Sequence, residues 1–301
     1  MSNQPTNLQI RNTFDEEFLK RLEKLHIMAQ KVYAGQNRAE RRSKKIGSGI
    51  EYADHRDYAP GDDIRYLDWN VFGRTEKMLV RLYEEEEDIS VYVLVDVSNS
   101  MMMGQPPKLE YAYKVTAALS YISLSNLDRV SVIPFAEHVT APMSPVRGKG
   151  QIFKVFDFLS QTTIGGATNS KEAFRSFVHR YKRRGPAIVI SDMYEEQGFA
   201  ESLNVLRYYK FDPMVIHIWD EAELNPNLRG DLKLIDCESG RSREVTITRA
   251  LVDKYRKAHA LFMEESENIC RTRQIPYFRA SIQTPFDDLV LQIFRRGGVV
   301  A

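Results

Sequence analysis

The chain has 301 residues, 43% of them hydrophobic, which is enough for a sizeable core in one large α/β domain with an appendage or in two modest domains. Its 42 basic and 41 acidic residues leave a net charge of +1, which argues against a dedicated nucleic-acid-binding protein. The two cysteines, Cys237 and Cys270, are too few for a disulfide framework and lack zinc-finger spacing.

The first residues, Met1–Asn7, contain neither a basic segment nor an apolar stretch, so no signal peptide is expected. No window approaches the roughly 18 uninterrupted apolar residues of a transmembrane helix. We therefore expect a cytoplasmic protein without a membrane span.

Residues 14–35 have apolar positions at helical spacing, which predicts an amphipathic helix. Its apolar stripe would contain Phe18, Leu22, Leu25, His26 and Met28. A basic run from Arg38 to Lys45 follows, and it is interpreted as a solvated linker or as a contact with an acidic partner or RNA. Residues 1–46 are thus predicted to be an N-terminal helix and a basic linker.

Residues 47–88 are dense in charged, aromatic and turn-forming residues, and we expect a small β or irregular subdomain. Ala59-Pro60-Gly61-Asp62-Asp63 is a strong turn signal, because proline fixes one corner and glycine permits positive φ at the next. Short strands or a hairpin are expected from the apolar residues Trp69, Phe72, Met78, Val80, Leu82 and Tyr83. The acidic run Glu84–Asp88 would be a solvated strand edge or meet a basic partner.

The charged residues of this subdomain could form a salt-bridge lattice. Such a lattice would fasten the subdomain to the main sheet, or part of it would be a docking surface for a partner. Its members would be Arg56, Asp57, Asp62, Arg65, Asp68 and Arg74, with Tyr58 and Trp69 packed against them.

From residue 89 onward strands and helices alternate. The strand candidates are Ser90–Asp96, Val130–Ala136, Ala187–Asp192, Pro213–Trp219 and Ile275–Ser281. Helices are expected near 108–125, 150–160, 170–182, 198–210, 249–272 and 285–296. Continuous apolar strands separated by helices predict a doubly wound, mainly parallel sheet covered on both faces.

Two further elements are expected within this domain, residues 89–301. Val139–Val146 contains two prolines and could be only a short edge strand. Residues near 231–248, with Glu238-Ser239-Gly240 at their middle, predict an inserted β-hairpin before the long helix.

Oxygen-bearing side chains follow the first strand of the sheet. Asp96, Ser98 and Ser100 alternate at its end, so their side chains would face one way. Carboxylate and hydroxyl oxygens suit Mg²⁺ far better than Zn²⁺. Alone, this pattern is more often a strand-to-helix turn with capping residues.

Two other segments would reach the same edge of the sheet, where ligands bind in open parallel sheets. Thr168 follows two glycines that permit close backbone approach, and Asp192 ends another buried strand. Each alone could be a helix cap. Together the five residues predict a site for Mg²⁺ or Mn²⁺.

This combination resembles the metal-ion-dependent adhesion site of von Willebrand factor A-type domains. The resemblance implies that Ser98, Ser100 and Thr168 are hydroxyl ligands and that Asp96 and Asp192 act directly or through water. An acidic residue of a partner protein would complete the coordination. The chain departs from the common Gly-Gly-Thr loop, because Ala167 stands before Thr168.

A second resemblance covers most of residues 40–295. The segment from Arg56 to Trp69, with Pro60-Gly61-Asp62-Asp63 inside it and Arg74, Lys77, Val80 and Arg81 beyond it, resembles the bacterial domain-of-unknown-function 58 family. The resemblance implies a von Willebrand A-type domain after this segment and a MoxR-type AAA+ ATPase as partner in chaperone-like assembly or maturation. Members often carry N-terminal membrane helices, and none is expected in this sequence.

We therefore expect a metal-dependent protein-interaction module and not an enzyme, because no nucleophile or base is positioned beside the oxygen ligands. One alternative is a metal-dependent, phosphatase-like hydrolase that uses Asp96, although Ser98 stands where aspartyl-phosphate phosphatases have a second aspartate. The other alternative is a scaffold protein whose metal site is not functional.

Overall fold

The computed structural model describes residues 13–36, 46–47, 51–84, 89–195 and 199–296. The basic run Arg38–Lys45 and the acidic residues 85–88 lie outside them. The chain forms two compact units: residues 34–88 make one, and residues 1–33 together with 89–301 make the other. The N-terminal helix therefore belongs to the same unit as the main sheet.

The larger unit is built on a six-stranded, mostly parallel sheet with the strand order β11-β8-β7-β4-β5-β6. Five strands are parallel, and only the edge strand β6 is antiparallel to its neighbour. Their bounds are β4 Ser90–Asp96, β5 Arg129–Phe135, β6 Val146–Arg147, β7 Pro186–Ser191, β8 Asp212–Trp219 and β11 Tyr277–Ser281. The mixed α/β class with a mainly parallel sheet is thus confirmed.

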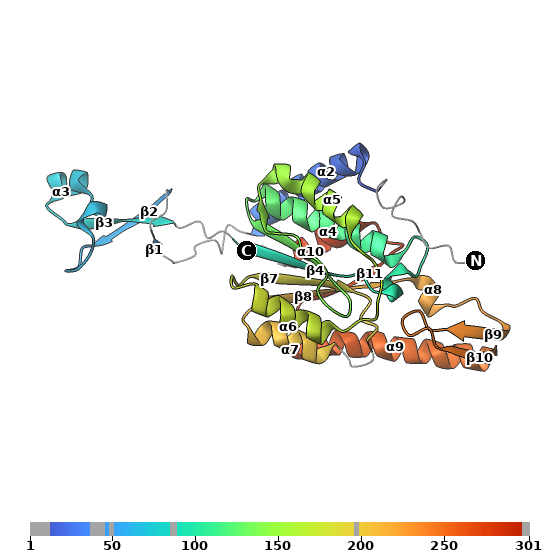
Figure 1. Ribbon diagram of the computed structural model, residues 1–301. Coiled ribbons are helices and arrows are strands. Elements are labelled where there is room, and N and C mark those ends of the chain that lie inside the picture. Colours follow the sequence, from blue (N-terminus) through green and yellow to red (C-terminus); the bar gives the residue numbers. More distant parts are fainter. Residues whose placement is uncertain (1–12, 37–45, 48–50, 85–88, 196–198, 297–301) are drawn as a thin grey trace. The chain divides into compact units, whose positions relative to one another are not determined.

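Helices cover both faces of this sheet (Figure 1). One layer contains α2 (Glu16–Gln36), α4 (Lys108–Ser125), α5 (Ile152–Gln161) and α10 (Phe286–Arg295), and the other contains α6 (Ser170–Arg180), α7 (Ala200–Tyr208) and α9 (Arg249–Thr272). Short helices lie at η2 (Asn99–Met102), η3 (Lys149–Gln151) and α8 (Glu221–Leu224).

The strand β4 shows why the sheet needs both layers. Val91, Val93 and Val95 belong to the core under α4, whereas Tyr92 and Leu94 belong to the core under α6 and α7. Successive side chains of a strand point to opposite faces, and all seven residues of β4 are buried. A continuous apolar run of this kind is stable only between two helical layers.

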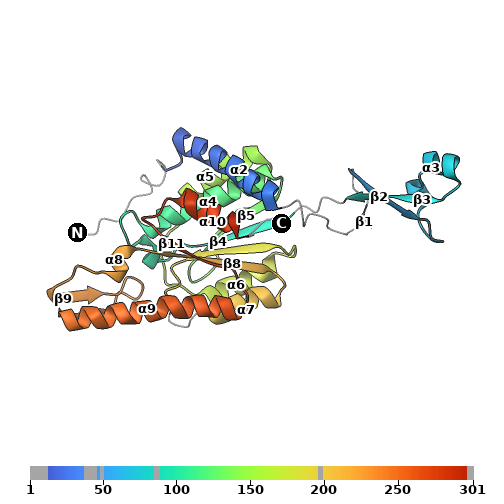
Figure 2. The ribbon, with the colours of Figure 1, turned by 180° about the vertical axis from the view of Figure 1, so that it is seen from behind.

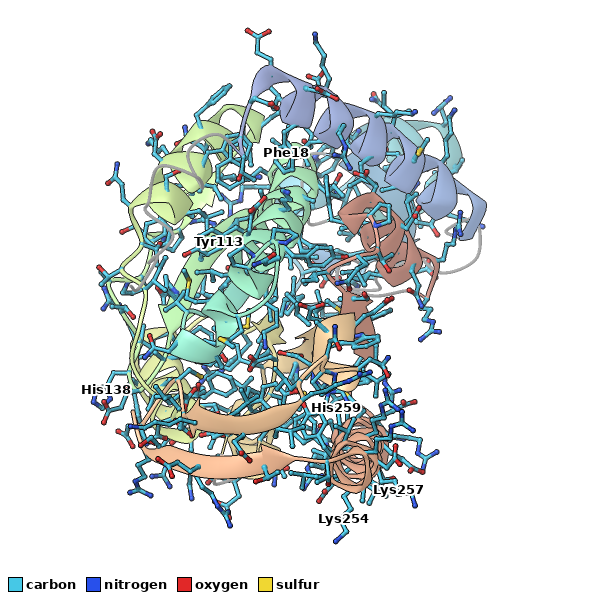
Figure 3. All side chains as sticks on the ribbon, turned by 90° about the vertical axis from the view of Figure 1, so that its right-hand side faces the viewer. Phe18, Tyr113, His138, Lys254, Lys257 and His259 are labelled. Atoms are coloured by element: carbon cyan, nitrogen blue, oxygen red, sulfur yellow. The ribbon has the colours of Figure 1, made fainter. Side chains whose placement is uncertain are left out.

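The helix α2 packs against the other helices of its layer, α4, α5 and α10, as Figure 2 shows from behind. Phe18, Leu22 and Leu25 are buried there, as expected, and Phe18 lies against the Phe286 ring of α10. The predicted stripe was wrong at Met28, which is 39% exposed, since Ala29 takes the buried position. Of the side chains labelled in Figure 3, Phe18 and Tyr113 lie in this layer.

The predicted hairpin is present as β9 (Gly230–Ile235) and β10 (Ser242–Ile247), which pair only with each other among the described strands. Most of its residues are exposed. Figure 3 shows the hairpin beside α9, with Lys254 and Lys257 of that helix pointing outward.

The smaller unit contains a three-stranded antiparallel sheet of β1 (Ile46–Gly47), β3 (Leu79–Glu84) and β2 (Glu51–Asp57), with η1 (Ile64–Tyr66) and α3 (Trp69–Thr75). The expected strand character of Trp69 and Phe72 was wrong. Both residues lie in α3, because Asp68 caps it by accepting hydrogen bonds from the Asn70 and Val71 amides.

The expected strand at Val139–Val146 is reduced to Val146 as part of β6 and an isolated bridge between Phe135 and Val139. The prolines in between cannot donate to a ladder. No helix in the described part of the chain is long and apolar enough to cross a membrane.

Candidate metal centre

The first three candidate residues meet where β4 ends, at the point where the strand order reverses between β5 and β7. The Ser98 and Ser100 hydroxyl oxygens are 3.0 Å apart. Asp96 is fully buried; its Oδ1 accepts a hydrogen bond from the Ser98 amide at 3.0 Å. Ser98 precedes η2 without capping it through its side chain, so the two hydroxyls face each other instead of the helix end.

The glycine loop is hydrogen bonded to the same strand end. The Gly165 amide donates to the Val97 carbonyl at 2.9 Å, and the Asn99 amide donates to the Gly166 carbonyl at 3.2 Å. Gly165 has φ +125°, and a Cβ there would lie 3.3 Å from the Asn99 side chain, so a residue other than glycine would strain the contact. The loop therefore brings Thr168 to the rim of the site, where Thr168 and Ser100 line one pocket.

The capping alternatives for Thr168 and Asp192 were wrong. Asn169, and not Thr168, caps α6 by accepting a hydrogen bond from the Glu172 amide. No helix begins directly after Asp192, since α7 starts at Ala200. Both side chains are thus left for other contacts.

Two buried acidic groups lie at the ends of the adjacent strands β4 and β7. Asp192 is fully buried beside Asp96, and burial together with the negative charge of Asp192 raises the pKa of Asp96 to about 7. The Asp96 Oδ2 atom accepts a 2.6 Å hydrogen bond from the Ser191 hydroxyl. Within the described residues Asp96 forms no salt bridge, so its charge is not balanced by a cationic side chain.

Asp192 has such a partner in Lys108, at the start of α4. The Lys108 ammonium is 1% exposed and lies 2.7 Å from Asp192 and 2.5 Å from Glu223. Although burial disfavours its charge, these two carboxylates raise the pKa of Lys108 above its ordinary value. Asp192 also accepts a hydrogen bond from the Tyr194 amide, so both of its oxygens are engaged.

Thr168 contacts the inserted hairpin. Its hydroxyl donates to Glu238 Oε1 at 3.1 Å, and its amide donates to Glu238 Oε2 at 3.4 Å. Glu238, Cys237, Ser100 and Thr168 line the same pocket, which has a volume of about 490 Å³.

Sequence reasoning missed four residues of this site: Ser191, Lys108, Glu223 and Glu238. Ser191 could have been found, because it directly precedes Asp192 at the end of β7, the strand that pairs in parallel with β4. The others come from distant segments, and nothing in the sequence near them indicates the contact.

The oxygen donors present suit a hard divalent cation. Adjacent oxygens in an octahedral Mg²⁺ shell lie about 3.0 Å apart, given Mg–O distances of about 2.1 Å. The Ser98–Ser100 and Thr168–Glu238 oxygen pairs have separations close to this value. The described residues contain no group of three His, Cys, Asp or Glu side chains with metal-ligand geometry, so any such cation would depend on the hydroxyls.

The candidate docking residues lie in the smaller unit, where several of them take part in ion pairs. Arg56 binds Asp62 through two hydrogen bonds, and Arg65 binds its neighbour Asp63. Asp68 pairs with Arg81 and His55. Arg74 donates to a carbonyl of its own helix, and Trp69 is 59% exposed.

A family model described as "Protein of unknown function DUF58" matches residues 54–265. The chain belongs to this family. The match covers the Arg56–Trp69 segment, the strand ends of the site and the hairpin.

Two uncharacterized proteins, one of Mycobacterium tuberculosis and one of Mycobacterium bovis, are each 27% identical to the chain over 220 residues, covering 71% of the chain and 69% of the relative. Among solved structures, a conserved hypothetical protein BatB from Bacteroides thetaiotaomicron is similar, with 15% identity, a TM-score of 0.46, and coverage of 69% of this chain and 98% of that one. An aerotolerance-related membrane protein from Bacteroides fragilis has 16% identity and a TM-score of 0.42, with coverage of 69% and 99%.

Proposed function

We propose that the chain is a metal-dependent protein-interaction module and that its larger unit is a von Willebrand A-type domain with a metal-ion-dependent adhesion site. The observation that carries this proposal is the buried carboxylate of Asp96, which has no cationic partner in the described residues and has two serine hydroxyls beside it. A buried carboxylate is costly unless a proton or a cation neutralises it.

In this proposal Ser98, Ser100 and Thr168 hold Mg²⁺ or Mn²⁺ through their hydroxyls. Asp96 supplies the charge, and Asp192 acts through water, since Lys108 and the Tyr194 amide engage its oxygens. The bound cation would supply an open position for an acidic group. The proposed role of this site is to bind a partner protein and not to catalyse a reaction.

The partner is a protein that presents an acidic side chain to the cation. A MoxR-type AAA+ ATPase, with a role in chaperone-like assembly or maturation, is the candidate that the family resemblance suggests. The exposed Trp69 and the Arg56–Asp62 pair are candidates for a second contact with that partner. We place this activity in the cytoplasm, and the two free cysteines are compatible with a reducing compartment.

Titration of Mn²⁺ into the purified protein tests the proposal. Saturable binding is expected for the wild type and for Ser90→Ala, a control at the opposite end of β4. Ser98→Ala should weaken binding by at least about tenfold, as expected for loss of a metal contact. Equal binding by the three proteins, or no saturable binding, would refute the metal site.

The buried pair of Lys108 and Asp192 favours a second candidate, a scaffold that binds its partner without metal. Here Lys108 would be the resident cation of the site. Partner capture that is unchanged by EDTA and by Ser98→Ala would support this candidate. Partner capture that is lost both in EDTA and in the Ser98→Ala variant would support the metal-dependent module.

A further inference from the structure

The tip of the β9–β10 hairpin enters the candidate metal centre. Both carboxylate oxygens of Glu238 accept hydrogen bonds from Thr168, one from its hydroxyl and one from its amide. Thr168 lies 70 residues away in the sequence. The hairpin thus delivers an acidic side chain to a residue that the proposed function makes a metal ligand.

The turn at the tip holds Glu238 in this position. Asp236 Oδ1 accepts hydrogen bonds from the amides of Glu238 and Ser239, at 2.9 Å and 2.7 Å. Gly240, with φ +67°, closes the turn by donating to the Asp236 carbonyl. The carboxylate is therefore oriented by the hairpin's own backbone.

The surroundings of Glu238 are rich in negative charge. Glu195 lines the same pocket, and burial together with the charge of Glu238 raises the pKa of Glu195. The Glu195 carboxylate accepts hydrogen bonds from the amide and hydroxyl of Ser170. Arg241 is the cationic residue of the pocket lining, and it is exposed. A divalent cation would stabilise this arrangement of carboxylates.

We propose that Glu238 is an internal ligand of the cation site, standing where a partner's carboxylate is expected to bind. Glu238 Oε1 is 3.1 Å from the Thr168 hydroxyl oxygen, close to the separation of neighbouring ligands in a Mg²⁺ shell. This inference rests on the proposed function and adds its regulation: the partner's acidic group must displace Glu238.

Displacement is feasible because the hairpin is weakly anchored at its tip. Its two strands are mostly exposed, and they pair only with each other among the strands described. Among the described residues, the Glu238 side chain is hydrogen bonded to the loop before α6 through its two bonds from Thr168. A competing carboxylate therefore has to break few contacts.

The test compares the wild type with Glu238→Gln and with Glu244→Gln, which makes the same change at an exposed position on β10 of the same hairpin. Mn²⁺ is the probe, and water-proton relaxation counts the exchangeable waters on the bound ion. Glu238→Gln should raise the Mn²⁺ dissociation constant about tenfold and add about one exchangeable water. Glu244→Gln should behave like the wild type.

Acetate then serves as a simple substitute for the partner's carboxylate. In Mn²⁺-loaded protein it should bind the ion in Glu238→Gln, with loss of the added water, at about a tenfold lower concentration than it needs to displace Glu238 in the wild type. Without metal, Glu238→Gln should also speed amide exchange of residues 236–241, since the tip loses its carboxylate contact with Thr168.

The outcomes separate the two proposals. If Mn²⁺ binds and depends on Ser98, but Glu238→Gln and Glu244→Gln have the same affinity and hydration, Glu238 is not a ligand and the metal-dependent module stands. If Mn²⁺ binding does not depend on Ser98, the metal site is wrong and the role of Glu238 is wrong with it.

Discussion

At the scale of single residues, burial makes the ionised form of the Asp96 carboxyl energetically unfavourable. Its pKa of about 7 means that folded, metal-free protein holds a proton there at pH values where the unfolded chain has released it. The stability that this neutral carboxyl provides is therefore present below about pH 4 and is lost as the pH rises through about 7. A bound divalent cation would reverse this dependence, because it favours the ionised form.

Asp96→Asn should accordingly stabilise the metal-free protein at pH 8, by a few kcal/mol at most, since each pKa unit corresponds to about 1.4 kcal/mol. Thermal unfolding between pH 5 and 8, with and without Mg²⁺, measures this. Mg²⁺ should stabilise the wild type and not the variant. Asp212→Asn, at an exposed position on β8, is the control. A variant less stable than the wild type at pH 8 without metal would contradict the assignment.

The buried environment of Lys108 determines how much stability the protein loses when this side chain is removed. Its removal would leave Asp192 without a cationic partner, and breaking a buried ion pair costs about 3–5 kcal/mol. Lys108→Met should lower the free energy of unfolding in denaturant by this amount. Lys114→Met, which breaks a half-exposed pair with Glu110 on the same helix, should cost less than about 1 kcal/mol. Similar losses for the two variants would show that the buried pair does not stabilise the fold.

At the scale of elements, α2 is part of the sheet unit although the smaller unit separates it from the rest in the sequence. Phe14, just before the start of α2, stacks on Phe156 of α5, and Arg21 of α2 pairs with Asp287 of α10. These contacts join the N-terminal helix to two helices from later in the chain. The helix therefore closes the apolar layer over α4.

Leu22→Ala should destabilise the larger unit by about 2–5 kcal/mol, because Leu22 is completely buried in this layer. Ile27→Ala on the same helix is the control, since Ile27 is 53% exposed, and it should cost less than about 0.5 kcal/mol. Denaturant unfolding monitored by far-UV circular dichroism provides both values. If Leu22→Ala were as mild as Ile27→Ala, α2 would not stabilise the sheet unit.

At the scale of the whole molecule, the smaller unit is an insertion between α2 and β4 of the larger one. Each unit has its own sheet, so the larger one should fold without the smaller one. Replacement of residues 34–88 by a flexible Gly/Ser linker should leave the far-UV circular dichroism of the larger unit and its Ser98-dependent Mn²⁺ binding intact.

The deletion also distinguishes the two candidate regions for partner contact, which are the cation site of the larger unit and the surface of the smaller unit. Loss of partner capture with retained Mn²⁺ binding would assign partner recognition to the smaller unit. Loss of cooperative unfolding would show that the larger unit needs the insertion to fold. The same deletion carrying Leu22→Ala should again be less stable, which controls for correct packing of α2.

Much of the fold could be predicted because burial leaves a clear pattern in the sequence. The apolar run Ser90–Asp96 coincides with β4, and the periodicity of 249–272 coincides with α9. The prediction was wrong at Trp69 and Phe72, where aromatic residues favoured a strand but the Asp68 cap starts a helix. A local hydrogen bond outweighed the propensity of the side chains there.

The sequence by itself determined the fold class, the family segment and the alternating oxygens after β4, because each depends on neighbours along the chain. Only the tertiary structure decided what faces those oxygens. Ser191 binds Asp96, Lys108 neutralises Asp192, and Glu238 reaches Thr168 from a hairpin 70 residues away. Such contacts depend on how strands and insertions pack, and the sequence pattern of a single segment carries no information about the residue opposite it.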